Sequence, residues 1–194
     1  MFKTIGRCDM NEILDVIKSR RSVRAYKSEP LKKEELETIV EAGIYAPTGC
    51  NQQPWHFSVV QDRALLDEVN IKTKQAMTQL PIDWMSKMGQ NPHLDVTHKA
   101  PVLIIVSTQK ESASGEVDCT AAMQNMMLEA HSMGIGSCWM GFVNLIFKDD
   151  DLMKRLGVPD GLLPQQAAVF GNKAKEDAPV PQRKTDVVTY TGTF

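Results

Sequence analysis

RRSVR at residues 20–24 and TGCNQQPW at residues 48–55 are the two most informative segments of this 194-residue chain. The first places three guanidinium groups and a hydroxyl within five residues, directly after an apolar helical pattern, where they can converge on a planar anion such as phosphate. The second is a Gly- and amide-rich loop that leads into an apolar strand, and its side chains can read the edge of a heterocycle. Together the two segments predict that both contact one ligand, a phosphorylated ring.

The segment before the arginines has the pattern of a helix. Asp9 and Glu12 have the spacing of a capping box, and an apolar stripe over residues 13–17 ends at Arg20. Cations at a helix C-terminus also complement the helix dipole, a contribution of about 0.3–1 kcal/mol. That is the alternative explanation of the cluster, but three arginines with Ser22 exceed that need.

Periodicity and turn residues predict an alternation of helices and strands over the rest of the chain. The apolar run VLIIV at residues 102–106 has the length and composition of a strand covered on both faces, at the centre of a sheet. Residues 79–98 lack periodicity and predict an irregular excursion outside the core. Further strands are expected at residues 55–60, 135–142 and 165–171, and helices from Pro30 to Pro47, from Asp62 through Val69, at 121–134 and at 148–157.

Composition favours one ordinary domain over residues 1–194, long enough to bury roughly 70% of its unfolded surface. The net charge of −2 and pI near 6.1 give no global field for nucleic acid or anionic lipid, so the partner is expected to be a small molecule. No signal peptide or membrane span is predicted, and a cytoplasmic enzyme is expected. Cys8, Cys50, Cys119 and Cys138 form no Cys-x-x-Cys pair, so we expect reduced thiols and no metal site.

Four segments in order along the chain resemble the motifs of the nitroreductase family of FMN-dependent oxidoreductases. They are SRRSVRAY, APTGCNQQPWHF, AAMQNMMLEAHSMGIGSCWMGF and PVPQRK. The resemblance implies an α+β fold, with a mixed, mostly antiparallel central sheet wrapped by helices, in an intertwined homodimer. It also implies that residues 172–194 form a C-terminal extension in which the β-prone residues 187–190 add a strand to the partner's sheet; a disordered tail is the alternative.

The resemblance also assigns roles around FMN. Arg20, Arg183 and Lys184 would hold the phosphate, with Ser22 at the ribityl-phosphate end, and Arg24 would reach the pyrimidine side. Asn51 and Gln53 would bind the pyrimidine edge, and residues 137–141 would lie against the isoalloxazine. Trp139 could equally be a core residue, and no catalytic side chain is assigned. The cofactor-binding candidates are Arg20, Arg21, Ser22, Arg24, Asn51, Gln53, Ser137, Cys138, Trp139, Met140, Gly141, Arg183 and Lys184.

The implied reaction is ping-pong transfer of a hydride from NADH or NADPH, through FMN, to a nitroaromatic, quinone or similar small acceptor. The lack of a Gly-x-Gly-x-x-Gly fingerprint argues against a Rossmann site but not against this function, because the nicotinamide ring needs only to stack on the flavin. Two alternatives remain open. One is a family relative with different flavin chemistry, such as dehalogenation, flavin fragmentation, or azoline or enone redox reactions. The other is a non-redox module that binds a phosphate ligand or nucleic acid.

Overall fold

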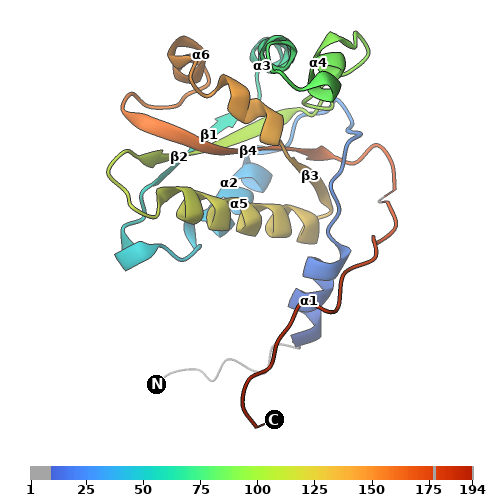
Figure 1. Ribbon diagram of the computed structural model, residues 1–194, viewed down its shortest axis with the longest axis vertical. Helices are drawn as coiled ribbons and strands as arrows, with labels where there is room; N and C mark the ends of the chain where they lie inside the picture. The colour runs from blue at the N-terminus through green and yellow to red at the C-terminus, as the bar shows by residue number, and fades with distance from the viewer. Residues whose placement is uncertain (1–9, 177, 194) are drawn as a thin grey trace.

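The computed structural model describes residues 10–176 and 178–193, and an antiparallel sheet of four strands in the order β1-β2-β4-β3 forms its centre (Figure 1). The strands are β1 (Trp55–Val60), β2 (Val102–Gln109), β3 (Ile135–Trp139) and β4 (Leu162–Asn172). The helices are α1 (Met10–Ser19), α2 (Lys33–Ile44), α3 (Arg63–Thr78), α4 (Asp83–Gln90), α5 (Gly115–Ser132) and α6 (Asp150–Arg155), with short 3₁₀ helices η1 (Gly49–Asn51) and η2 (Gly141–Ile146). The predicted α+β class is confirmed.

The predicted central strand is β2, which pairs with β1 on one side and β4 on the other. Its side chains alternate between the two faces of the sheet, and both faces are buried, which explains the continuous apolar run in the sequence. Leu103 and Ile105 face one layer, whereas Ile104 and Val106 face the other.

Helices cover both faces of the sheet (Figure 1). One layer contains α3, η2 and α6, and its buried core includes Leu66, Val69, Val143, Ile146 and Leu152. The opposite layer contains α2 and α5, whose core residues include Ile39, Met123, Met126, Met127 and Ala130. The sheet and these two layers make a rigid frame, from which the loops at the sheet ends project.

Several predicted segments differ from the structure: β3 ends at Trp139, short of the predicted residue 142, and α5 begins at Gly115, ahead of the predicted residue 121. Helix α2 begins at Lys33, later than Pro30, because the Lys32 backbone N–H donates to Glu35 Oε2 at 2.7 Å and caps the first turn. The excursion at residues 79–98 contains a helix, α4, which packs on α3. Gly89 permits that packing, because a Cβ there would lie 2.6 Å from the Lys74 carbonyl oxygen.

Helix ends follow the predicted turn residues more closely. Helix α5 ends just before Gly134, which has a φ of +78°, and α6 ends just before Gly157, with a φ of +83°. Asp62 caps α3 by accepting a hydrogen bond from the Leu65 backbone N–H at 3.0 Å. The capping box predicted at the start of α1 involves Asp9, which lies outside the described residues.

The C-terminal tail leaves the end of β4 and runs past α1 (Figure 1). Residues 178–193 form no strand within the described single chain, and Val187, Val188 and Tyr190 are exposed. The expectation that this tail completes a partner's sheet stays a prediction. No helix in the described part of the chain combines the length and the hydrophobicity needed to cross a membrane.

Candidate functional site

The arginine segment lies directly against the edge strand β3. The Val23 backbone N–H donates to the Ser137 carbonyl oxygen at 2.9 Å, and Ser22 forms a parallel bridge with Ser137. Gly136 allows this close approach, since a Cβ there would lie 2.9 Å from the Val23 side chain. The structure therefore brings together two of the predicted site segments, residues 20–24 and 137–141.

The three arginines of that segment do not act as one unit. Arg21 is buried, and its guanidinium donates to the carbonyl oxygens of Arg20 and, at 2.6 Å, Lys18. It thus satisfies the last carbonyls of α1, as the helix-end alternative predicts. These contacts give Arg21 a fold-stabilising role, and the ligand contact expected of it stays a prediction.

Arg20 is half-buried. Its Nη1 atom is buried and has no hydrogen-bond partner within the described residues. Burial lowers the pKa of the Arg20 guanidinium, and the like charges of Arg21 and Arg183 lower it further. Arg183 reaches this position because the tail packs beside the last turn of α1, where a hollow is lined by Lys18, Ser19 and Arg183. Guanidinium groups that repel one another in this way form a site that an anion would stabilise.

A cavity of about 610 Å³ continues from the end of β3. Arg24 of the arginine segment lines it, and the predicted residues 138–141 form one wall. The other walls are mostly apolar, with Met85 and Met88 of α4 and Phe142 of η2 among them. A cavity of this size and lining suits a flat, mainly apolar ligand with a few polar groups.

Residues 79–98 contribute to the cavity, although their sequence shows no clear pattern. Trp84 packs at a tilt on Phe142, with ring centroids 6.2 Å apart, and holds α4 over η2. His98 also lines the cavity and was not singled out from the sequence. Its backbone φ of +54° is uncommon for a non-glycine residue, and no motif in the sequence predicts that conformation.

Three predicted site residues of β3 have different environments. Trp139 donates from Nε1 to Gln166 Oε1 at 3.1 Å and packs into the α5 layer, which supports the core alternative for its side chain. Ser137 Oγ is buried without a partner within the described residues. Burial raises the pKa of the Cys138 thiol, which therefore stays neutral at physiological pH.

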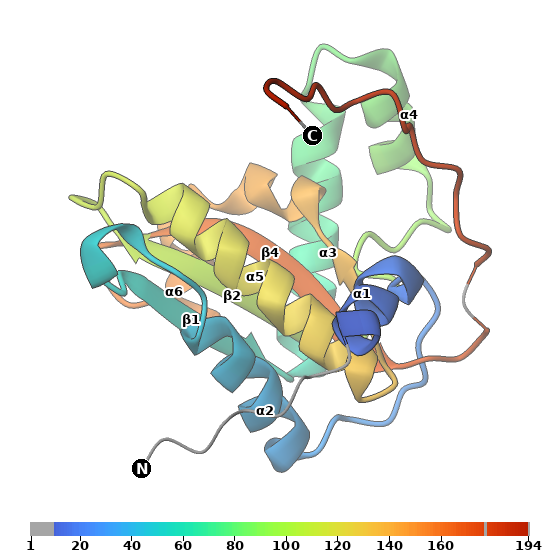
Figure 2. The same ribbon diagram turned by 90° about the horizontal axis from the view of Figure 1, so that it is seen from below.

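The amide loop lies at the opposite end of the molecule. The Gly49 backbone N–H donates to Asp118 Oδ1 at 3.3 Å near the start of α5, whereas Ser19 is hydrogen-bonded to His131 near its end. These contacts are at Asp118 and His131 of α5, and with a rise of about 1.5 Å per residue the two points lie roughly 20 Å apart along the helix. Figure 2 shows α1 at one end of α5 and the loop of residues 48–54 at the other. A single chain does not bring the two predicted segments to one ligand.

The amide loop is nevertheless preformed. Asn51 and Gln53 have positive φ angles of +55° and +48°, and Gln53 Nε2 donates to Asn51 Oδ1 at 3.1 Å. Thr48 Oγ1 accepts a hydrogen bond from the Gln53 backbone N–H at 3.2 Å. Both amide side chains are exposed, so they are available to a molecule outside this chain.

The sequence matches the model of the nitroreductase family over residues 17–171. The chain belongs to the nitroreductase family. A crystal structure of a nitroreductase with bound FMN from Bacteroides fragilis is 32% identical, with a TM-score of 0.86, and the match covers 94% of this chain and 100% of that one. This nitroreductase fold confirms the predicted architecture and enzyme class.

Two curated relatives differ in their chemistry. An FMN reductase [NAD(P)H] from Bacillus subtilis is 25% identical over 207 residues, covering 95% of this chain and 75% of the relative. An iodotyrosine deiodinase from Thermotoga neapolitana is also 25% identical, over 135 residues, covering 66% of this chain and 73% of the relative. The nitroreductase family therefore includes both reductase and dehalogenase activities among the relatives of this chain.

Proposed function

We propose that this nitroreductase-family protein binds FMN and transfers a hydride from NADH or NADPH to small acceptors such as nitroaromatics and quinones, by a ping-pong mechanism. The observation that carries the proposal is the buried Arg20 Nη1, which has no hydrogen-bond partner among the described residues and lies near the charge of Arg183, together with the cavity that Arg24 lines. A phosphate would satisfy the first group and a flat ring system would occupy the cavity. FMN contains both parts in one molecule.

The described residues fit FMN from end to end. Arg20 and Arg183 would hold the phosphate through charge-assisted hydrogen bonds, with Lys184 following on the same exposed tail and Ser22 beside Arg20. We leave Arg21 out of the proposed ligand set, since its guanidinium donates to the carbonyl oxygens of Lys18, in α1, and Arg20, just after it.

The ring system would lie along the end of β3. Residues 138–141 line the cavity, and a Cβ on Gly141 would meet no atom within 4 Å, so the backbone there is open to a ligand. Arg24 would place its positive charge at the pyrimidine side of the ring. When bound, FMN would supply the hydride-transfer chemistry. The protein's own residues bind the cofactor, orient it and bias its charge.

Asn51 and Gln53 require a second subunit to reach the same cofactor, so we propose a homodimer. Apolar side chains on the surface of α1 and α2 support it, since Ile13, Ile17 and Tyr45 are exposed and line a common groove. The exposed Val187, Val188 and Tyr190 of the C-terminal extension would add to the same interface. Each FMN would then contact the arginines of one subunit and the amide loop of the other.

The donor and the acceptor would use the same cavity in turn. Its apolar walls, including Met85, Met88 and Phe142, suit planar rings that stack on the flavin. No side chain is assigned as a proton donor in this step. Cys50, Cys119 and Cys138 are free thiols, which fits the cytoplasmic location that we propose.

Dehalogenation is the second candidate function, favoured by the similarity to an iodotyrosine deiodinase. Both functions are tested by loading the protein with FMN, reducing the flavin, and following its reoxidation in a stopped-flow instrument. The acceptors are nitroaromatics, quinones, free flavins, enones and 3-iodotyrosine. We expect nitroaromatics or quinones to reoxidise the flavin fastest. Preferential turnover of iodotyrosine with release of iodide would replace the reductase assignment with the dehalogenase one.

A further inference from the structure

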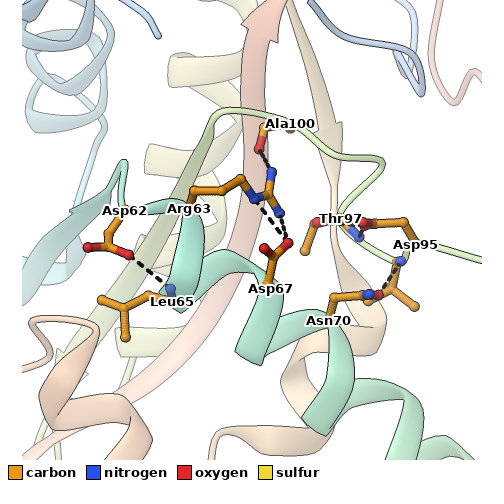
Figure 3. Close-up of polar contacts among 9 residues, drawn as sticks. Asp62, Arg63, Leu65, Asp67, Asn70, Asp95, Thr97 and Ala100 are labelled. Atoms are coloured by element: carbon orange, nitrogen blue, oxygen red, sulfur yellow. Dashed lines mark hydrogen bonds and ion pairs between the residues drawn. The ribbon is translucent and has the colours of Figure 1, made fainter. Parts of the chain in front are cut away.

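The turn at residues 95–100 forms one wall of the cavity, and α3 holds it at both ends (Figure 3). Asn70 Oδ1 accepts a hydrogen bond from the Val96 backbone N–H at 2.9 Å. Arg63, which is also paired with Asp67, donates to the Ala100 carbonyl oxygen at 3.5 Å. The turn is therefore fixed to a long helix of the frame.

Hydrogen bonds inside the turn fix its shape. Asp95 Oδ1 accepts from the Thr97 backbone N–H at 2.9 Å and from Thr97 Oγ1 at 2.7 Å, and Thr97 is fully buried. His98 and Lys99 follow with positive φ angles of +54° and +55°. Two consecutive non-glycine residues in the left-handed region are rare and persist only where the surroundings enforce them.

Because of this backbone conformation, the side chains of the turn line two different hollows. His98 lines the 610 Å³ cavity, whereas Asp95 and Lys99 line a separate hollow of about 530 Å³ on the other side of the turn. The fixed turn thus presents the imidazole to the same cavity that Arg24 lines.

Burial and the surrounding charges favour the neutral form of His98. Burial lowers the pKa of the His98 imidazole, and the nearby Arg24 guanidinium lowers it further, against a smaller opposite effect of Asp95. Cys138, the other titratable group of the cavity lining, is itself neutral because burial raises the pKa of its thiol. A neutral imidazole can accept one hydrogen bond and donate another, which a guanidinium cannot do.

We propose that His98 is a further flavin-contacting residue, which hydrogen-bonds the polar edge of the pyrimidine ring of bound FMN beside Arg24. The inference rests on the proposed function, since it requires FMN in the cavity. That edge of the ring presents both N–H and C=O groups, so a donor–acceptor imidazole complements a donor-only guanidinium there. The strained, doubly fixed turn would then serve to hold the imidazole in place before the cofactor binds.

The test is the His98→Asn variant, because Asn tolerates the left-handed backbone while its shorter side chain withdraws the imidazole. The matched control is His93→Asn, which alters an exposed histidine of the same segment. The dissociation constant of FMN is measured from the recovery of flavin fluorescence on dilution of the loaded protein, and riboflavin is measured in the same way. Far-UV circular dichroism verifies the fold of each variant.

We expect His98→Asn to weaken FMN binding roughly three- to tenfold, the effect of one lost hydrogen bond. Riboflavin binding should weaken by the same factor, because the contact is with the ring and not with the phosphate, while His93→Asn should match the parent. If His98→Asn does not fold, His98→Gly, which also accepts the positive φ, takes its place with the same expected loss. Parent-like affinity in the folded His98 variant would overturn the inference alone. A parent protein that binds no FMN would overturn the proposed function and this inference together.

Discussion

Arg20→Ala should impair FMN binding and spare the fold, whereas Arg21→Ala should mainly impair the fold. The two side chains are adjacent in sequence but opposite in role. The buried Arg21 guanidinium donates to the carbonyl oxygens of Lys18 and Arg20. Arg20 has a buried Nη1 with no partner in the described part of the chain, and it lies close to the charges of Arg21 and Arg183.

The magnitudes follow from these environments. Losing a charge-assisted contact to phosphate costs about 1.5–3 kcal/mol, which is roughly a 10- to 150-fold increase in the dissociation constant. Removing Arg20 from the protein without cofactor should cost little stability, because the repulsion with Arg21 and Arg183 is relieved at the same time. Removing Arg21 leaves helix-end carbonyls unsatisfied and should lower the free energy of unfolding by about 1–3 kcal/mol.

The assay compares FMN with riboflavin, which lacks the phosphate, and follows urea unfolding of the cofactor-free protein. Arg20→Ala should lose affinity for FMN but not for riboflavin, with an unchanged urea midpoint. Arg20→Lys should recover part of the FMN affinity, since it restores the charge without the planar fork. An Arg20→Ala protein that purifies as fully loaded as the parent would refute the phosphate role.

Three further predictions concern the flavin charge, the tail and a helix cap. Arg24→Gln should make the flavin harder to reduce more than it weakens FMN binding, because the lost charge acts mainly on the reduced anion; an unchanged midpoint potential contradicts this. Cutting the chain after Val180 should abolish dimerisation, measured by light scattering, and FMN retention, measured by absorbance. Arg183→Ala should lose FMN and stay dimeric. A truncated protein that is still an FMN-loaded dimer would show that the tail is needed for neither. Asp149→Ala removes the N-cap of α6 and should lower the free energy of unfolding by about 1 kcal/mol in urea. The hydrogen bond from Lys72 lowers the pKa of the Asp149 carboxyl, as does the one from the Leu152 backbone N–H. The stabilisation by ionised Asp149 should therefore be fully present above the ordinary aspartate pKa and be lost as the pH falls through the lowered pKa.

Local sequence chemistry predicted the frame of the fold well. The VLIIV run could be placed at the sheet centre because only a strand buried on both faces uses apolar residues without alternation. Asp62, Gly134 and Gly157 marked helix boundaries through capping and positive φ, which are properties of single residues. Helix α4 was missed because its eight residues are too few for a clear period, and Gly89, a poor helix former, is there for close packing on α3.

The candidate site was less predictable because it depends on where side chains turn and which elements meet. Three arginines in five residues predict one cluster. In the structure Arg21 donates to the Lys18 carbonyl oxygen of α1, whereas Arg20 Nη1 has no partner among the described residues. The separation of residues 20–24 from the amide loop depends on the length of α5 between them, a long-range property of the topology. His98 lines the cavity because the turn at residues 95–100 has an uncommon backbone conformation, which the hydrogen bonds of Asp95 and Asn70 hold in place.

The most direct test of the central claim is an anaerobic titration of the purified, FMN-loaded protein with NADH and with NADPH, followed by visible absorbance. We expect about one equivalent of at least one of the two nucleotides to bleach the oxidised flavin bands completely, and a nitroaromatic or quinone then to restore them. A protein that binds no FMN, or whose bound flavin stays oxidised in excess NADH and NADPH, would contradict it.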